Sequence, residues 1–290
     1  MMSSENIQQI ESLPAGLYLV ATPIGNLRDI TLRALDILHA ADMILCEDTR
    51  VTKKLLSAYG IRTPVQAYHE HSDDSVRTKM MSLIERGKAI ALVSDAGMPL
   101  MSDPGFKLVR SVKEKDLYLT SLPGANAYLM ALQLSGLPCE KFTFLGFLPP
   151  KSGARKNILK EWTNSPATFG FYEAKQRVLK TLADIASILG EERQICVARE
   201  LTKKFEEVLS GSVKTILTEL GEREDLKGEF VILIAPDATQ ESNQEDIESD
   251  IRICLENGEK AKTISEILAE KYNLPRSQIY DLILQLKNNS

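Results

Sequence analysis

The chain has 290 residues, more than one average domain needs, and its 43% hydrophobic and 26% charged residues are typical of globular proteins. This composition excludes a disordered, collagen-like or coiled-coil protein. The formal net charge of −5 argues against a generally cationic coat for nucleic acid.

The sequence also carries no sign of export or of a membrane anchor. Apolar runs stay well short of the roughly 18–20 residues of a membrane-spanning helix. The first residues, MMSSENIQQIES, lack the basic-then-apolar order of a signal peptide. The four cysteines are far apart without a CxxC pair, which favours neither a zinc site nor a disulfide framework. We therefore expect a cytoplasmic protein with no membrane partner and no metal.

After a tail at residues 1–12, short apolar runs alternate with helical patterns through residues 13–146, which we expect to form a first α/β domain. Strands are expected at 17–21, 43–46, 65–68, 89–94 and 117–121, with helices at 31–40, 52–59, within 73–85, within 106–115 and at 125–134. Strands that alternate with helices predict parallel βα units in a doubly wound sheet, with helices on both faces.

Two prolines and a glycine interrupt the pattern at 147–153 (FLPPKSG), which predicts a linker. The alternation then resumes, and predicts a second α/β domain at 154–236. Its expected elements are helices at 154–162, 178–189 and from 213, and strands at 168–172, 194–199, 207–209 and 230–234.

The C-terminal part is polar at 237–250, which indicates a second linker, and 251–290 has no strand signal. We expect a small module of two or three helices there, which resembles a helix-turn-helix. Six basic and ten acidic residues in 241–290 leave RNA contact and a packing or dimer role both open.

Three loops follow expected strands, which is where open α/β sheets bind ligands. They are ATPIGN at 21–26, SDAGMPLMSDPG at 94–105 and LPGANA at 122–127. The first is neither a GxGxxG nor a GxxxxGK[ST] motif, so a Rossmann site and a P-loop are not supported. In the second, Asp95 can accept hydrogen bonds from a ribose or an amino group, whereas Ser102 or Asp103 is expected to cap a helix that Pro104 begins.

Other polar clusters have simpler interpretations. Glu47-Asp-Thr-Arg50 at a strand end is more simply explained by salt bridges than by catalysis, and His69 and His71 have i, i+2 spacing, which is unsuited to zinc on a helix. The segment 141–160 holds five basic residues and no acid. It fits a phosphate-binding surface and a solvated linker equally well.

Taken together, ATPIGN, SDAGMPLMSDPG, LPGANA, ARELTKKFEE and GEFVILI resemble the tetrapyrrole methylase superfamily in order and spacing. The resemblance implies an S-adenosylmethionine-dependent methyltransferase with two α/β domains and the cofactor in the cleft between them. ATPIGNLRDITLRAL, CEDTRVTKKLL and GFLPPKSG are similar to the members that methylate the ribose 2′-oxygen of a cytidine in the decoding region of 16S rRNA. The likeness covers about 15–235 and is weaker in the helical tail.

That likeness implies 16S rRNA of the small ribosomal subunit as partner and a homodimer. The first loop departs from the GxGxGD form of the precorrin methylases, which counts against a tetrapyrrole substrate. A precorrin-type C-methyltransferase nevertheless stays an alternative, as does a silent ribosome-binding protein that keeps the fold.

The resemblance also implies site residues. The cofactor contacts that it implies are Ile24, Asp95, Met98, Ala125, Asn126, Tyr172, Ala198 and Phe230. The expected RNA contacts are Arg28, Arg50, Lys53, Lys151, Arg155 and Lys156. Methyl transfer leaves a neutral thioether, so it needs no leaving-group acid, whereas a base that takes the ribose proton would help. Candidate bases are Asp29, Glu47, Glu173 and Glu200, with His69 as a weaker one and late proton transfer to water as another route.

Overall fold

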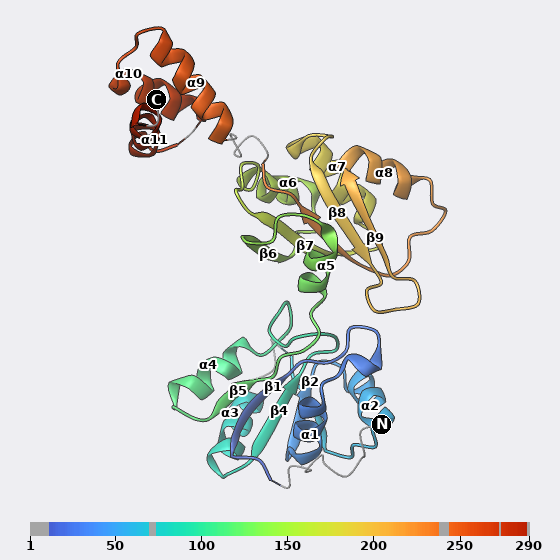
Figure 1. Ribbon diagram of the computed structural model, residues 1–290. Coiled ribbons are helices and arrows are strands. Elements are labelled where there is room, and N and C mark those ends of the chain that lie inside the picture. The colour runs from blue at the N-terminus through green and yellow to red at the C-terminus, as the bar shows by residue number, and fades with distance from the viewer. Residues whose placement is uncertain (1–11, 70–73, 238–243, 273, 289–290) are drawn as a thin grey trace, which may run out of the picture.

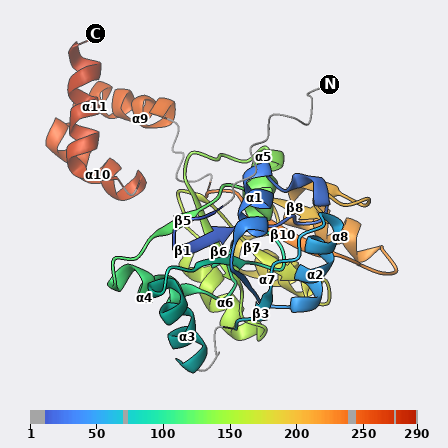
Figure 2. The same ribbon diagram turned by 90° about the horizontal axis from the view of Figure 1, so that it is seen from below.

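The computed structural model describes residues 12–69, 74–237, 244–272 and 274–288. Two five-stranded sheets lie one above the other in Figure 1, and a group of C-terminal helices lies apart from both. Figure 2, viewed from a perpendicular direction, again shows the C-terminal helices apart from the rest of the chain. The expected fold class, two α/β domains and a small helical module, is confirmed.

The first sheet is entirely parallel, with the strand order β3-β2-β4-β1-β5. Its strands are β1 (Gly16–Val20), β2 (Met43–Cys46), β3 (Val65–Ala67), β4 (Ala89–Val93) and β5 (Leu119–Ser121). Side chains alternate between the two faces, so Tyr18 and Val20 enter one core and Leu17 enters the other.

Helices cover both faces of this sheet. They are α1 (Leu32–Ala40), α2 (Thr49–Ala58), α3 (Asp74–Glu85) and α4 (Phe106–Glu114), and a short 3-10 turn, η1 (Leu27–Asp29), precedes α1. Buried residues of α1 and α2 pack with Tyr18, and those of α3 and α4 pack with Leu17. The predicted doubly wound arrangement is therefore present.

The second sheet is mixed, with the order β6-β7-β10-β8-β9 and one parallel pair, β6 with β7. Its strands are β6 (Phe142–Phe147), β7 (Thr168–Ala174), β8 (Gln194–Arg199), β9 (Glu207–Ser212) and β10 (Glu229–Ile234). One face packs on α6 (Ser152–Glu161), α7 (Val178–Leu189) and α8 (Val213–Gly221).

The other face is covered by α5 (Ala127–Ser135), whose Tyr128 and Leu132 pack on Val231 and Leu233. The sequence did not signal β6, because its side chains are only half buried and its pairing with β7 is irregular near Gly146, where φ is +66°. Since α5 and β6 both join the second sheet, we propose that the boundary between the two α/β domains precedes α5 and does not lie near residue 146.

The helical group consists of α9 (Gln244–Glu256), α10 (Ala261–Tyr272) and α11 (Arg276–Asn288). Helix α9 begins within the predicted 237–250 linker, so that prediction is wrong from residue 244 onward. The buried residues Ile251, Ile264, Leu268, Ile279 and Ile283 form a core of their own. Within the described ranges, no helix has the length and apolar character needed to cross a bilayer.

Candidate ligand-binding site

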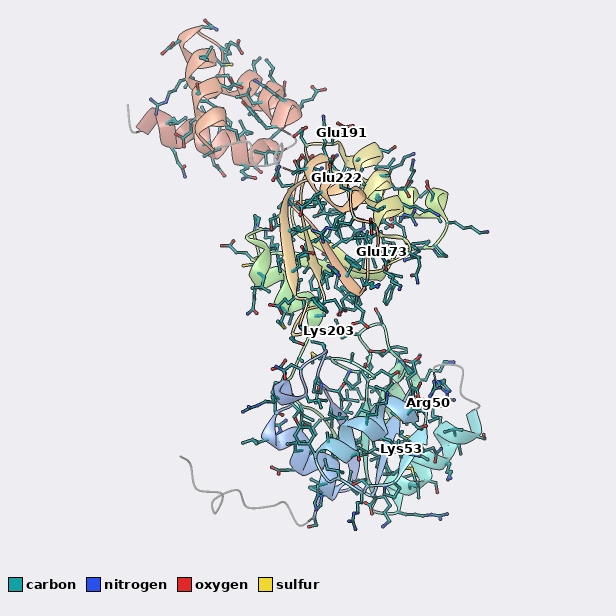
Figure 3. All side chains as sticks on the ribbon, turned by 90° about the vertical axis from the view of Figure 1, so that its right-hand side faces the viewer. Arg50, Lys53, Glu173, Glu191, Lys203 and Glu222 are labelled. Atoms are coloured by element: carbon teal, nitrogen blue, oxygen red, sulfur yellow. The ribbon has the colours of Figure 1, made fainter. Side chains whose placement is uncertain are left out.

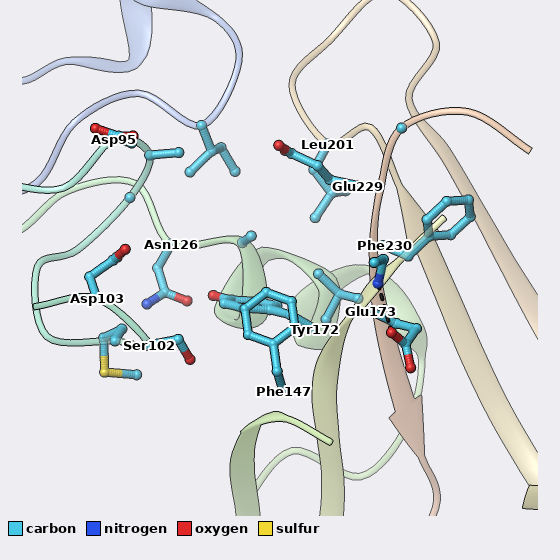
Figure 4. Close-up of a pocket in the computed structure, with 18 of the residues that line it drawn as sticks. Asp95, Ser102, Asp103, Asn126, Phe147, Tyr172, Glu173, Leu201, Glu229 and Phe230 are labelled. Carbon is cyan, nitrogen blue, oxygen red and sulfur yellow. Dashed lines mark hydrogen bonds between the residues drawn. The ribbon is translucent and has the colours of Figure 1, made fainter. Parts of the chain in front are cut away.

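A cavity of about 510 Å³ lies between the loops at the carboxyl edge of the first sheet and the residues of the second sheet and its loops. Its lining from the first sheet's loops is Ile24, Asp95–Met98 and Met101–Asp103, followed by Asn126 and Ala127 at the start of α5. Its lining from the second sheet is Phe147, Tyr172–Gln176, Leu201 and Gly228–Val231. Figure 4 shows Asp95, Asp103 and Asn126 on one side of the space, with Leu201, Glu229 and Phe230 across from them.

The strand order explains why this space exists. Strands β1 and β4 are neighbours, but the connection after β1 leads to α1 on one face of the sheet and the connection after β4 leads to α4 on the other face, so a crevice opens at the carboxyl edge. Backbone bonds join the two loops, from Thr22 N to Gly97 O at 2.9 Å and from Gly97 N to Thr22 O at 3.0 Å. The hydroxyl of Thr22 also donates to Ser94 O at 2.9 Å. The two loops thus form one fixed wall.

The loop after β4 has an unusual backbone. Leu100 and Ser102 have φ of +70° and +73°, a region that non-glycine residues rarely adopt. Gly105, at +132°, is the N-cap of α4 and provides no side-chain cap. The prediction that Ser102 or Asp103 caps this helix is therefore wrong, and both line the cavity instead. Backbone strain of this kind is concentrated at functional sites.

Asp95 has a central position. It lines the main cavity and also two adjoining cavities of about 250 and 460 Å³. Its Oδ1 accepts a hydrogen bond from the backbone N–H of Asp48 at 3.0 Å, which fixes the direction of the carboxylate. The side chain can therefore contact ligands from more than one side.

Asp103, which the sequence pattern suggested as a helix cap, has a carboxylate that lines the cavity. Its Oδ2 lies 2.6 Å from the hydroxyl of Ser94 at the end of β4. Burial raises the pKa of Asp103, the Ser94 hydrogen bond offsets part of this effect, and the negative charges of Glu47 and Asp95 raise the pKa further. The carboxylates Glu47, Asp95 and Asp103 were each visible in the sequence, but their proximity in the folded chain was not.

At the start of α5, the Asn126 side chain accepts from Leu129 N at 2.9 Å and so caps the helix. A Cβ on Gly124 would lie 2.6 Å from the Cβ of Ala21, so only glycine lets this loop approach the loop after β1. The third expected loop thus meets the first through a close backbone approach.

The wall from the second sheet is aromatic. The ring of Tyr172 lies 4.7 Å from that of Phe144 and 5.6 Å, edge to face, from that of Phe147. Burial raises the pKa of Tyr172, and the nearby Asp103 charge adds to this effect. Phe147 itself is 57% exposed, so a large apolar surface is open to a ligand.

Six of the eight expected cofactor contacts line the cavity, namely Ile24, Asp95, Met98, Asn126, Tyr172 and Phe230. Ala125 and Ala198 are outside the lining. Ala198 is completely buried in β8, in the core that α5 covers, and Ala125 is partly buried at the edge of that core. The structure brings the other six together from both domains.

A polar clamp joins the domains beside the cavity. The backbone N–H of Asn26 in the first domain donates to Thr202 Oγ1 in the second domain at 3.0 Å. Within the second domain, Lys203 Nζ reaches Glu200 at 2.9 Å and Glu229 at 2.8 Å. Figure 3 shows Lys203 between the two domains. The hydrogen bond from Lys203 lowers the pKa of Glu200, so this carboxylate is held ionised and engaged.

The structure places the other candidate bases in different environments. Asp29 is exposed on η1 and lines none of the three cavities. Glu173 lines the main cavity, but its carboxylate is buried and accepts from Arg177 Nε at 2.6 Å and from Thr181 Oγ1 at 2.7 Å. Glu47 is exposed and lines the outer cavity of about 460 Å³ together with His69.

Most of the expected RNA contacts lie at the surface. Arg28, Arg50, Lys53 and Lys151 are exposed, and Figure 3 shows Arg50 and Lys53 on the first domain. Arg50 also binds Asp48, with Nη2 at 2.6 Å from Oδ2. Lys156 is half-buried beside Asp184.

Arg155 is the exception, because it is 2% exposed and faces the protein interior. Its guanidinium donates to Asp184 Oδ2 from Nε at 2.8 Å and from Nη2 at 2.5 Å. A buried and paired guanidinium is not available to a phosphate, so the assignment of Arg155 to RNA contact is withdrawn. In the sequence, the other basic residues of 141–160 made Arg155 look like part of a cationic surface.

No group of three or more His, Cys, Asp or Glu side chains in the described ranges could hold a metal ion. His71 lies outside those ranges.

The sequence has clear relatives. The profile of the family described as Tetrapyrrole (Corrin/Porphyrin) Methylases matches residues 16–217. The chain is 42% identical over 277 residues to "Ribosomal RNA small subunit methyltransferase I" of Rickettsia prowazekii, covering 95% of this chain and 98% of that one. It is 40% identical over 272 residues to the protein of the same name from Bacillus subtilis, covering 91% and 92%.

Solved structures share the fold at low identity. The methyltransferase CobJ aligns with a TM-score of 0.58 at 16% identity, over 77% of this chain and 95% of that one. The uroporphyrin-III C-methyltransferase of Thermus thermophilus, complexed with S-adenyl homocysteine, aligns with a TM-score of 0.52 at 16% identity, over 75% and 96%. From the profile and the curated relatives, the chain belongs to the tetrapyrrole methylase superfamily and, within it, to the ribosomal RNA small subunit methyltransferase I family.

Proposed function

We propose that this chain is an S-adenosylmethionine-dependent methyltransferase that methylates the ribose 2′-oxygen of a cytidine in 16S rRNA of the small ribosomal subunit. The observation that carries this proposal is identity of about 40% along nearly the whole chain to proteins named for small-subunit rRNA methylation. The solved neighbour that contains S-adenyl homocysteine, the demethylated form of the donor, supports the choice of cofactor.

The cavity suits this cofactor in size and chemistry. Pockets of about 300–1,000 Å³ hold ligands of this size, and the volume here is about 510 Å³. The apolar side chains of Ile24, Met98 and Phe230 can pack on an adenine ring. The Asp95 carboxylate can accept from ribose hydroxyls or from an ammonium group.

When bound, the cofactor supplies a methyl group on a sulfonium centre. The protein has to hold this group in line with the acceptor oxygen, and positioning of this kind can lower a barrier by roughly 7–11 kcal/mol. We propose that Ile24, Asp95, Met98, Asn126, Tyr172 and Phe230 provide the cofactor contacts. The clamp of Asn26 on Thr202 keeps the two walls of the site in register.

For the RNA, we propose contacts from Arg28, Arg50, Lys53, Lys151 and Lys156, all of which have at least part of the side chain at the surface. Neutralisation of phosphates by these side chains makes binding weaken as salt increases. We also propose that the protein acts as a homodimer, which sedimentation can test directly.

The experiment is transfer of a labelled methyl group to small ribosomal subunits that lack the modification. The product is digested with alkali, because a 2′-O-methyl group protects the adjoining linkage. One protected cytidine linkage is the expected result. Label in alkali-sensitive linkages refutes ribose methylation, and label on a porphyrinoid but not on RNA indicates a tetrapyrrole C-methyltransferase.

A further inference from the structure

We propose that Asp103 is the general base that accepts the proton of the acceptor ribose hydroxyl. This inference rests on the proposed ribose methylation and names a residue for a step that the sequence left unassigned.

The position of Asp103 is the first argument. It lies in the main cavity, on the same side as Asp95 and Asn126 (Figure 4), and is carried by the strained loop after β4. Ser94 anchors its Oδ2 at 2.6 Å. Among the described residues, Oδ1 has no hydrogen-bond partner, so one carboxylate oxygen is left for a ligand.

The second argument is that the surroundings satisfy both protonation states. Ser94 Oγ lies 2.6 Å from Asp103 Oδ2 and 3.0 Å from the carbonyl oxygen of Ala96. A hydroxyl has one proton to donate and two lone pairs that accept. When Asp103 is ionised, Ser94 donates to it. When Asp103 is protonated, it can donate to Ser94, which then turns its own proton to Ala96 O.

The charges around Asp103 favour proton uptake. Burial raises its pKa, and Glu47 from the end of β2 and Asp95 from its own loop raise it further. Tyr172 faces it from β7 and has a pKa raised by burial. The other charged groups of the cavity are Glu173, paired with Arg177, and Lys175 and Glu229 on the wall of the second sheet. Asp103 is thus a stronger base than an ordinary aspartate.

The other carboxylates of the site have different tasks. Glu173 and Glu200 are held by Arg177 and Lys203. Glu47 is exposed to water in the outer cavity, and one oxygen of Asp95 is bound by Asp48 N. Asp103 is the partly buried carboxylate of the main cavity that is anchored by Ser94 through one oxygen and keeps the other without a partner among the described residues.

In the step, Asp103 takes the proton from the 2′-hydroxyl while the 2′-oxygen forms its bond to the methyl carbon. The carbon–sulfur bond of the donor breaks, and its electron pair stays on sulfur as a neutral thioether. The products are the 2′-O-methyl ribose and protonated Asp103, which then releases its proton to water.

The test measures single-turnover methyl transfer to unmodified small subunits as a function of pH, with cofactor affinity measured separately by calorimetry. Asp103→Asn keeps the shape and removes the base, so we expect the rate to fall about 10²–10⁴-fold with cofactor affinity unchanged. Asp116→Asn, at an exposed site after α4, is the matched control and should behave as wild type.

Ser94→Ala separates a base from a structural residue. Loss of the Ser94 hydrogen bond removes stabilisation of the ionised form and raises the pKa of Asp103. A base must be ionised, so activity is lost as pH falls through its pKa, and we expect this acid limb to move up by about one pH unit in Ser94→Ala. The residual rate of Asp103→Asn should show no such loss of activity at low pH.

Two results overturn the proposal while wild type still methylates ribose. One is an active Asp103→Asn variant, and the other is an acid limb that stays in place in Ser94→Ala. Absence of ribose methylation by wild type, despite cofactor binding, overturns the proposed function itself, and the assignment of Asp103 with it.

Discussion

Replacement of Arg155 by leucine should destabilise the second α/β domain without a specific loss of RNA affinity. The Arg155 side chain is 3% exposed and binds Asp184, whose side chain is 9% exposed. It also donates from Nη1 to the carbonyl oxygens of Pro149 and Pro150, at 3.3 Å each. These bonds fasten the PPKSG segment to α7, next to the cavity wall that holds Phe147.

The magnitude follows from burial of the pair. Removal of one partner of a buried ion pair costs about 3–5 kcal/mol, because the other charge is left without compensation. Here Ser152 Oγ still donates to Asp184 at 2.9 Å, and Lys156 Nζ lies 3.5 Å away. We therefore expect the lower end of the range, about 3 kcal/mol of unfolding free energy.

Trp162 is a convenient probe, since it is the single tryptophan of the chain and its ring lies 5.4 Å from Phe169 in this core. With an m-value of about 1–3 kcal/mol/M, a loss of about 3 kcal/mol lowers the urea midpoint by about 1–3 M. Lys156→Ala in the same helix removes a half-exposed cation and should cost less than about 1 kcal/mol.

The double variant with leucine at both Arg155 and Asp184 should recover most of the loss, because it leaves no buried charge alone. An unchanged midpoint for Arg155→Leu, combined with weaker binding to small subunits, would refute this reasoning and restore Arg155 to the RNA surface.

Three further outcomes are expected. Asp95→Ala should weaken S-adenosylmethionine binding at least tenfold by calorimetry with little effect on the urea midpoint, because a half-buried loop carboxylate supports no apolar core; wild-type affinity would remove it from the site. Lys151→Glu with Lys156→Glu should lower affinity for small subunits and flatten its salt dependence, while cofactor affinity stays the same; an unchanged salt slope would dismiss this surface. Deletion of 238–290 should leave cofactor affinity intact, because the described residues of α9–α11 have a core of their own; loss of affinity would place these helices in the catalytic body.

The sequence was most informative about the first sheet. Each of its strands is a short apolar run between helical patterns, and this periodicity is local, so β1 and β4 were found within a residue or two. The three predicted loops also meet as expected, because the carboxyl ends of parallel strands share one edge. Four of the six expected contacts that line the cavity, Ile24, Asp95, Met98 and Asn126, lie in these loops and converge for that reason.

The elements that the sequence pattern did not predict share one physical cause, because each depends on contacts with residues that are distant in the chain. Strand β6 is half buried, and it is recognisable only through its pairing with β7. Helix α9 begins in a polar segment and is supported by apolar residues from α10 and α11. Propensity and local pattern do not contain such contacts.

Short motifs and near-neighbour spacing were therefore enough to identify the family, the succession of βα units and the loops that carry the site. The role of each charged side chain, in contrast, depends on contacts that form only in the folded chain. Arg155 is one of five cations in a basic segment, and it is structural because Asp184, 29 residues later, is buried against it. Asp103 follows a serine in a loop that looks like a helix cap, and it is a cavity carboxylate because the left-handed backbone at Leu100 and Ser102 turns it toward Ser94. Burial and proximity set charge and pKa, and both arise only when the chain has folded.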